Sequence, residues 1–167
     1  KKSIKICQTT IVSIFLNPAQ FSPEEDFNKY PVTVELDIKK LSHLQVDCVF
    51  LPSVSEMYPE GFSTQVQENI LSSVLEGQSR PEFFSGVLTI VAKLFNIIEP
   101  THTFFGKKDA QQFRIIEKLI TDLNYPIEII PCPIIREENG LAMSSRNENL
   151  NNKERLIAAT IAQALEE

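Results

Sequence analysis

Short apolar runs alternate along this chain with stretches in which apolar residues recur every three or four positions. The runs are rich in β-branched or aromatic residues and cover residues 11–16, 46–51, 103–105 and 126–130. In the three longer runs, apolar residues follow one another without strict alternation, which is typical of parallel strands buried on both faces. We therefore expect three buried parallel strands and one further short strand at 103–105.

Helical spacing of apolar residues predicts four helices, at residues 33–44, 84–98, 111–123 and 152–167. The first helix carries the apolar residues Val34, Leu36, Ile38 and Leu41. The apolar positions at helical spacing are Val87, Ile90, Val91, Leu94 and Phe95 in the second, Phe113, Ile116, Leu119 and Ile120 in the third, and Leu156, Ile157, Ile161 and Leu165 in the fourth. Strands that alternate with helices predict an α/β fold, in which helices wrap a doubly wound parallel sheet.

Composition limits the class of protein. The 167 residues are 43% hydrophobic and 23% charged, enough for one globular domain or for one domain and a fragment of a second. A formal net charge of −6 argues against a nucleic-acid partner, because general binding to the phosphate backbone needs clustered Lys and Arg. No apolar stretch has the length of a membrane span, and no signal peptide opens the chain.

The cysteines and histidines show no pattern of a reactive or metal-binding site. Cys7, Cys48 and Cys132 form no C-x-x-C pair, so we expect neither a disulfide scaffold nor zinc, and a reducing cytoplasm fits best. Apolar neighbours favour buried, inert thiols at Cys7 and Cys48. His43 and His102 have no partner at the spacing of a metal ligand, so we expect ordinary surface or interface residues without a catalytic role.

Polar residues follow each predicted strand. Asn17 and Gln20 come after the first run, residues 52–59 after the second, Lys108 after the third and residues 131–147 after the last. Ligands of parallel sheets bind beyond the carboxyl ends of the strands. We therefore expect these polar groups to gather around one shared cleft.

Residues 106–109 (Gly-Lys-Lys-Asp) lie at a predicted strand-to-helix junction. Free backbone N–H groups and the helix dipole favour an anion there, and a lysine adds a positive charge. The same residues equally fit a solvated helix start. No Walker A glycine pattern is present, so a phosphate site here would not be a P-loop.

Ser144, Ser145 and Arg146 supply two hydroxyl donors and a guanidinium, which suits a polyphosphate whose charge shifts during reaction. The alternative is a polar turn before the last helix, with Ser or Asn as a cap. Residues 137–140 indicate a solvated turn rather than a metal site.

Two further loops carry polar residues. Glu76 and Arg80 share a short loop, where spacing alone favours an internal ion pair. Asn17 and Gln20 could hydrogen-bond a small polar substrate, or merely cap the loop that Pro18 turns.

Six motifs occur in a fixed order along the chain. They are SIFLNPxQF at 13–21, EDxxxYP at 25–31, LEGxSRP at 75–81, VAKLFN at 91–96, FGxKDxQQ at 105–112 and MSSRN at 143–147. In this order they resemble the pantothenate synthetases, and the resemblance covers about residues 4–165.

The resemblance implies a Rossmann-like nucleotidyltransferase fold, with a nucleotide- and pantoate-binding domain at 1–133 and the start of a small C-terminal lid domain at 134–167. It implies a carbon–nitrogen ligase whose substrates are pantoate, beta-alanine and Mg-ATP, with Mg²⁺ carried by ATP and no tightly bound cofactor. Pantoate would attack the α-phosphate to give pantoyl adenylate and pyrophosphate, and the amine of beta-alanine would displace AMP. A cytoplasmic homodimer is also implied.

The resemblance also assigns roles to single residues. Those implied to bind pantoate are Asn17, Gln20, Gln112 and Tyr30. Those implied to bind ATP are Phe105, Gly106, Lys108, Asp109, Ile135, Met143, Ser144, Ser145 and Arg146. Among these, Lys108 and the residues at 144–146 would stabilise charge during catalysis, Asp109 would contact ribose and Met143 would lie against adenine. Glu76 and Arg80 match a loop that closes beside the active site.

The chain departs from the family pattern in two places. The HIGH-like segment with its two histidines would precede Lys1 and is not in the sequence, so we expect an incomplete, catalytically impaired chain, cut at its C-terminus as well. Phe83 stands where the family has His in Arg-Pro-Gly-His-Phe. The alternatives are another adenylyl or cytidylyl transferase, and a truncated, non-catalytic paralogue that serves as a binding or dimerisation module.

Overall fold

The computed structural model describes residues 1–21 and 33–166. Its α-helices are α1 (Lys2–Ile6), α2 (Val34–His43), α3 (Val54–Met57), α4 (Glu76–Ser79), α5 (Phe83–Ile98), α6 (Ala110–Asp122) and α7 (Asn152–Glu166), and its strands are β1 (Ile11–Ser13), β2 (Cys48–Phe50), β3 (His102–Gly106) and β4 (Glu128–Cys132). Short 3₁₀ helices are η1 (Pro18–Gln20), η3 (Leu71–Ser73), η4 (Lys107–Asp109) and η5 (Ser145–Asn149). The four predicted strands and four predicted helices are all present, with ends shifted by up to three residues.

The strands are parallel, as predicted, but the described strands form two sheets rather than one. β1 pairs with β2, and β3 pairs with β4 from His102 opposite Glu128 to Gly106 opposite Cys132. No described strand joins β1 to β3. Among the described residues, each strand therefore pairs with another strand along one edge only.

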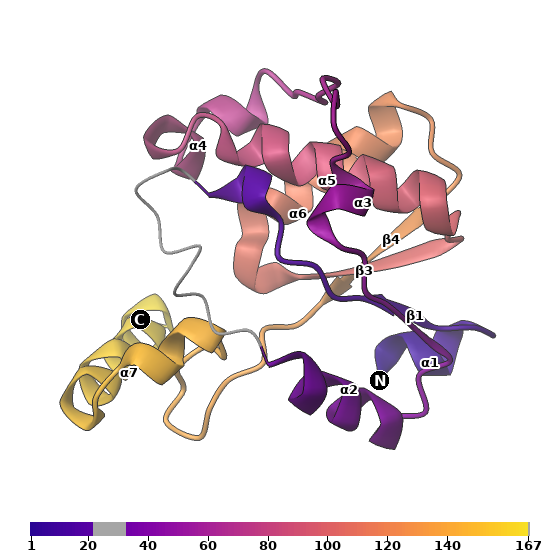
Figure 1. Ribbon diagram of the computed structural model, residues 1–167. Helices are drawn as coiled ribbons and strands as arrows, with labels where there is room; N and C mark the ends of the chain where they lie inside the picture. Colours follow the sequence, from indigo (N-terminus) through magenta and orange to yellow (C-terminus); the bar gives the residue numbers. More distant parts are fainter. Residues whose placement is uncertain (22–32, 167) are drawn as a thin grey trace.

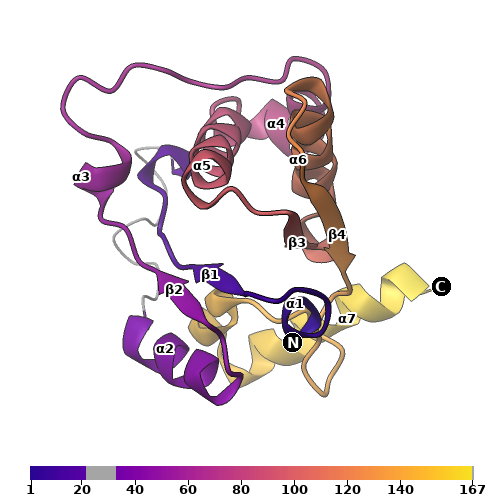
Figure 2. The ribbon, with the colours of Figure 1, turned by 90° about the vertical axis from the view of Figure 1, so that its right-hand side faces the viewer.

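Helices lie on both faces of the strand layer. α5 and α6 cover one face, and α1 and α2 lie on the other (Figure 1). The perpendicular view shows the same order, with α7 on the side of α1 and α2 (Figure 2). This arrangement confirms the α/β class and the doubly wound layering expected from alternating strands and helices.

The hydrophobic core gathers around α5 and α6. Every residue of α5 from Phe84 to Ala92 is buried, and Ile115 and Ile116 of α6 are fully buried. Burying a large aliphatic or aromatic side chain contributes roughly 1.5–3 kcal/mol. These two helices therefore supply most of the buried core, and the inward positions predicted for α6 are confirmed.

Outside that core, several strands and side chains that were predicted to be buried are exposed. The prediction of fully buried strands is wrong for all three longer runs, since Ile11 is 40% exposed and Cys48 and Glu128 are exposed. Neither predicted buried thiol is fully buried: Cys7 is half-buried and Cys48 exposed.

In α2, Leu36 and Ile38 are likewise open, at 56% and 40% exposed, whereas Val34 and Leu41 are half-buried. The main cluster consists of residues from α3, α5 and α6, and of β1 and β2 only Phe50 packs against it. None of the described helices is long and apolar enough to cross a membrane.

Candidate active site

A cleft of about 1160 Å³ lies between the loop after β1, the segment around α4, the start of α6 and η5. The predicted site residues that line it are Asn17, Gln20, Glu76, Arg80, Lys108, Asp109, Gln112, Ser144, Ser145 and Arg146. Polar groups far apart in the sequence thus face one space, because parallel strands deliver their following loops to one edge. The expected shared cleft exists.

Asn17 anchors the loop after β1. Its side chain is almost completely buried, donates from Nδ2 to Gly86 O (3.1 Å), and accepts at Oδ1 from the Tyr58 hydroxyl (2.7 Å) and from Ala19 N. Burial raises the pKa of the Tyr58 hydroxyl, with its hydrogen bond to Asn17 as a smaller opposing effect. Asn17 therefore caps η1, the second of its two predicted roles, and its oxygen is fully engaged with the protein.

Gly86 lets η1 lie directly on α5. A Cβ at this position would lie 2.1 Å from Ala19 O, which is too close for any side chain to fit. Only glycine permits this approach, which holds Gln20 at the edge of the cleft.

Arg80 ties the α4 segment to the same loop. Its Nη1 lies 2.7 Å from Glu76 Oε1, which confirms the predicted ion pair, and its Nη2 donates to Gln20 O (2.9 Å). The guanidinium carbon lies 3.8 Å from the centroid of the Phe83 ring. Phe83 thus supports Arg80 through a cation–π contact at the wall of the cleft.

Just before α6, η4 supplies a lysine and an aspartate to the cleft. Lys108 and Asp109 are both partly exposed, with 3.5 Å between Nζ and Oδ1. Gln112 lies one turn further along the helix. Phe105 and Gly106 do not line the cleft: Phe105 packs against the core, and Gly106 ends β3.

Ser144 caps η5, as the alternative prediction for this motif had it, by accepting from Arg146 N (3.3 Å). Behind it, buried Asn147 donates to Glu137 Oε1 (2.8 Å), and Arg155 Nη1 lies 2.7 Å from Glu137 Oε2. The Asn147 and Arg155 hydrogen bonds lower the pKa of the Glu137 carboxyl. Glu137 is therefore a paired anchor of this turn rather than a solvated residue.

Two further predicted ligand residues do not line the cleft. Ile135 and Met143 are neighbours, with Met143 N donating to Ile135 O (2.9 Å), but both are more than half exposed and neither lines the cleft. A third predicted ligand, Tyr30, lies outside the described residues.

The cleft also contains residues that no motif indicated. Asp37 and Lys40 of α2 line it, 3.8 Å apart, as do Ser53 and Glu56 at the start of α3. Hydrogen bonds from the backbone and side chain of Ser53 lower the pKa of Glu56. The position of residues 52–59 after a strand was a usable signal for α3, whereas nothing in the sequence showed which face of α2 turns to the cleft.

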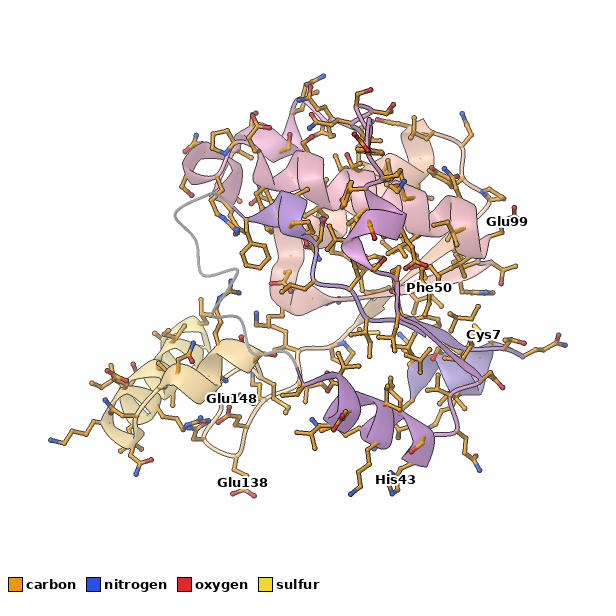
Figure 3. All side chains as sticks on the ribbon, viewed as in Figure 1. Cys7, His43, Phe50, Glu99, Glu138 and Glu148 are labelled. Carbon is orange, nitrogen blue, oxygen red and sulfur yellow. The ribbon has the colours of Figure 1, made fainter. Side chains whose placement is uncertain are left out.

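Neither histidine lines the cleft. His43 points into solvent at the end of α2 (Figure 3), and His102 lies in β3, 3.6 Å from Glu128. Among residues 1–21 and 33–166, His, Cys, Asp and Glu form no group of three or more that could hold a metal ion.

Comparison with known proteins identifies the family. The protein-family model described as pantoate-beta-alanine ligase matches residues 1–167. The chain belongs to this family. A pantothenate synthetase of Carboxydothermus hydrogenoformans is 57% identical over 156 residues, and one of Thermosipho africanus is 53% identical over 156 residues. Each alignment covers 93% of this chain but only 55% and 56% of those relatives, so the chain spans about half of their length.

Solved structures of the ligase family share this fold. Pantothenate synthetase from Thermus thermophilus superposes with a TM-score of 0.96 at 42% identity, over 99% of this chain and 60% of that one. The Francisella tularensis pantoate-beta-alanine ligase, solved with beta-gamma ATP and beta-alanine, has a TM-score of 0.93 at 40% identity, over 99% and 64%. The Rossmann-like nucleotidyltransferase fold implied by the six motifs is thereby confirmed.

Proposed function

We propose that this chain is part of a ligase that condenses pantoate with beta-alanine at the expense of ATP. The single observation that supports the proposal is the cleft, which has amide side chains of Gln20 and Gln112 in the same space as Lys108 and Arg146. Amides suit a small hydroxy acid, and cations suit a polyphosphate. The relative from Francisella tularensis, solved with beta-gamma ATP and beta-alanine, adds support.

The proposed reaction has two steps. A pantoate carboxylate oxygen attacks the α-phosphorus of Mg-ATP, so that the bond from this phosphorus to the oxygen bridging it to the β-phosphate breaks and pyrophosphate leaves. The amine of beta-alanine then attacks the acyl carbon of pantoyl adenylate, loses a proton and displaces AMP. Such chemistry depends on positioning and on stabilising charge rather than on a protein nucleophile. Mg²⁺ belongs to the ATP substrate in this scheme.

The residues divide between the two substrates. Gln20 and Gln112 bind pantoate, with Asn17 and Tyr30 beside them. The nucleotide is bound by those predicted ATP residues that line the cleft, namely Lys108, Asp109, Ser144, Ser145 and Arg146. Lys108 and Arg146 stabilise the negative charge that moves from the α-phosphate to pyrophosphate, which is why both belong at the cleft wall.

By itself this chain binds substrates but turns over poorly, in our proposal. The reason is that no imidazole of the described residues lines the cleft, so the charge on the phosphates meets fewer donors than adenylation requires. The two separate sheets of the described strands are consistent with this, because a further parallel strand would have to lie between β1 and β3 to complete one sheet across residues 1–133. Residues 134–167 then begin the lid domain of a cytoplasmic homodimer.

The experiment measures AMP formation by the full-length protein with ATP, pantoate and beta-alanine. We expect AMP only when all three substrates are present, and no AMP would refute the ligase function. Calorimetry on the 167-residue chain separates the alternatives. Pantoate and Mg-ATP binding without turnover supports an incomplete enzyme, whereas no binding of either substrate favours a non-catalytic dimerisation module.

A further inference from the structure

Leu75 has a backbone conformation that side chains rarely adopt. It precedes α4 with φ 51° and ψ −121°, and its side chain is 74% exposed. An exposed side chain gains little from its own packing, so this conformation must be enforced by neighbouring groups. Glycine would adopt it without strain.

Gln111 is the neighbour that enforces it. Its Oε1 accepts from Glu76 N (3.1 Å), and its Nε2 donates to Val74 O (2.7 Å) and to Leu71 O (2.9 Å). The carboxamide thus bridges the two residues on either side of Leu75. Both amide hydrogens and the oxygen of Gln111 are engaged with main-chain groups of one segment.

The bridge continues towards the opposite wall of the cleft. The N–H of Glu76 donates to Gln111, and the Glu76 carboxylate pairs with Arg80. Arg80 in turn donates to Gln20 O, and its guanidinium lies over the Phe83 ring. A series of contacts therefore runs from the first turn of α6 to η1. Each contact is local, but together they join the two walls that carry Gln112 and Gln20.

We propose that Gln111 is a positioning residue, which holds Leu75 and Glu76 so that Arg80 can fix Gln20 for binding the hydroxy acid. The part concerning the hydroxy acid rests on the proposed function. Gln111 contacts no substrate in this scheme, and its adjacent residue Gln112 does. Glutamate at position 111 cannot replace it, because a carboxylate would face the carbonyl oxygens of Val74 and Leu71 without a hydrogen to donate.

The first test is amide exchange by NMR in the 167-residue chain, with the Glu76 N–H compared with the core amide of Ile116. We expect Gln111→Ala to speed exchange at Glu76 about tenfold or more relative to Ile116, because the oxygen that accepts the Glu76 N–H is removed. Arg114→Ala, an exposed change on the same helix, is the matched control and leaves the ratio unchanged. Unchanged protection of Glu76 in the Gln111→Ala variant overturns the proposal.

The second test uses Leu75→Gly, which removes the need for the bridge. Gln111→Ala lowers pantoate affinity about tenfold in the wild-type background, with Mg-ATP affinity retained, and lowers it less in the Leu75→Gly background. A general loss of structure would lower both affinities in both backgrounds. Fast exchange at Glu76 with unchanged pantoate affinity overturns the positioning role. If the wild-type chain binds no pantoate, the proposed function of this chain fails, and exchange at Glu76 alone decides the role of Gln111.

Discussion

α6 and α7 are amphipathic helices of 13 and 15 residues that end up in opposite environments. α6 buries the apolar face that its spacing predicts, with Ile116 completely inaccessible. α7 turns its large apolar residues outward, with Ile161 62% exposed, and packs on Ala159 and Ala162 instead. The comparison teaches that helical spacing identifies residues that share a face, whereas the cover for that face has to come from another segment.

The largest effect should come from truncating a side chain in each helix. Ile116→Ala leaves a cavity in the core and should cost roughly 2–5 kcal/mol of unfolding free energy. Ile161→Ala removes an exposed side chain and should change it by less than about 0.5 kcal/mol. Urea titrations followed by circular dichroism measure both. Equal losses would mean that α7 packs its apolar face in solution.

A glycine change sets local propensity against tertiary contact. Within a helix, Gly→Ala normally stabilises by about 1 kcal/mol. Gly86→Ala should instead destabilise by roughly 1–3 kcal/mol, because the new Cβ would meet Ala19 O at 2.1 Å. Thermal unfolding gives the difference, and crystallography of the variant would show whether η1 moves off α5. A stabilised variant would contradict the close approach.

The cleft wall should respond to substitution without loss of fold. Lys108→Ala should weaken Mg-ATP binding about tenfold, since one charge-assisted contact to phosphate is lost, while unfolding free energy changes little. Lys107→Ala is the matched control, because Lys107 is exposed and does not line the cleft. Calorimetry measures affinity. If Lys108→Ala unfolds the chain, the lysine is structural.

The smallest effect concerns acid pH and the turn before α7. Because Asn147 and Arg155 stabilise the charged form of Glu137, its pKa is lowered, so this support is present above the ordinary carboxyl range and is lost as pH falls through the lowered pKa. Protection factors of the α7 amides, which correct for the pH dependence of intrinsic exchange, should therefore fall in acid, and Glu137→Gln should show the lower protection already at neutral pH. Exchange in α6 is the internal control. A pH response equal in both helices would reflect global unfolding.

Several site features could be read from the sequence because they are local. The ion pair of Glu76 with Arg80 follows from a spacing of four residues, and the capping roles of Asn17 and Ser144 follow from residue type and position. The contacts made by Lys40 and Gln111 could not be read in this way. The contacts of Gln111 depend on partners more than 30 residues away, and those of Lys40 depend on which face of α2 meets the cleft.

The sequence by itself determined the alternation of strands and helices, the buried face of α6 and the family, because these depend on periodicity and on ordered motifs. Tertiary structure alone decided which apolar faces are covered, that Gly86 must lack a side chain, and that Gln111 holds a strained Leu75. These features arise from groups that meet only after the chain has folded. The free energy of each contact therefore depends on atoms of residues that are far away in the sequence.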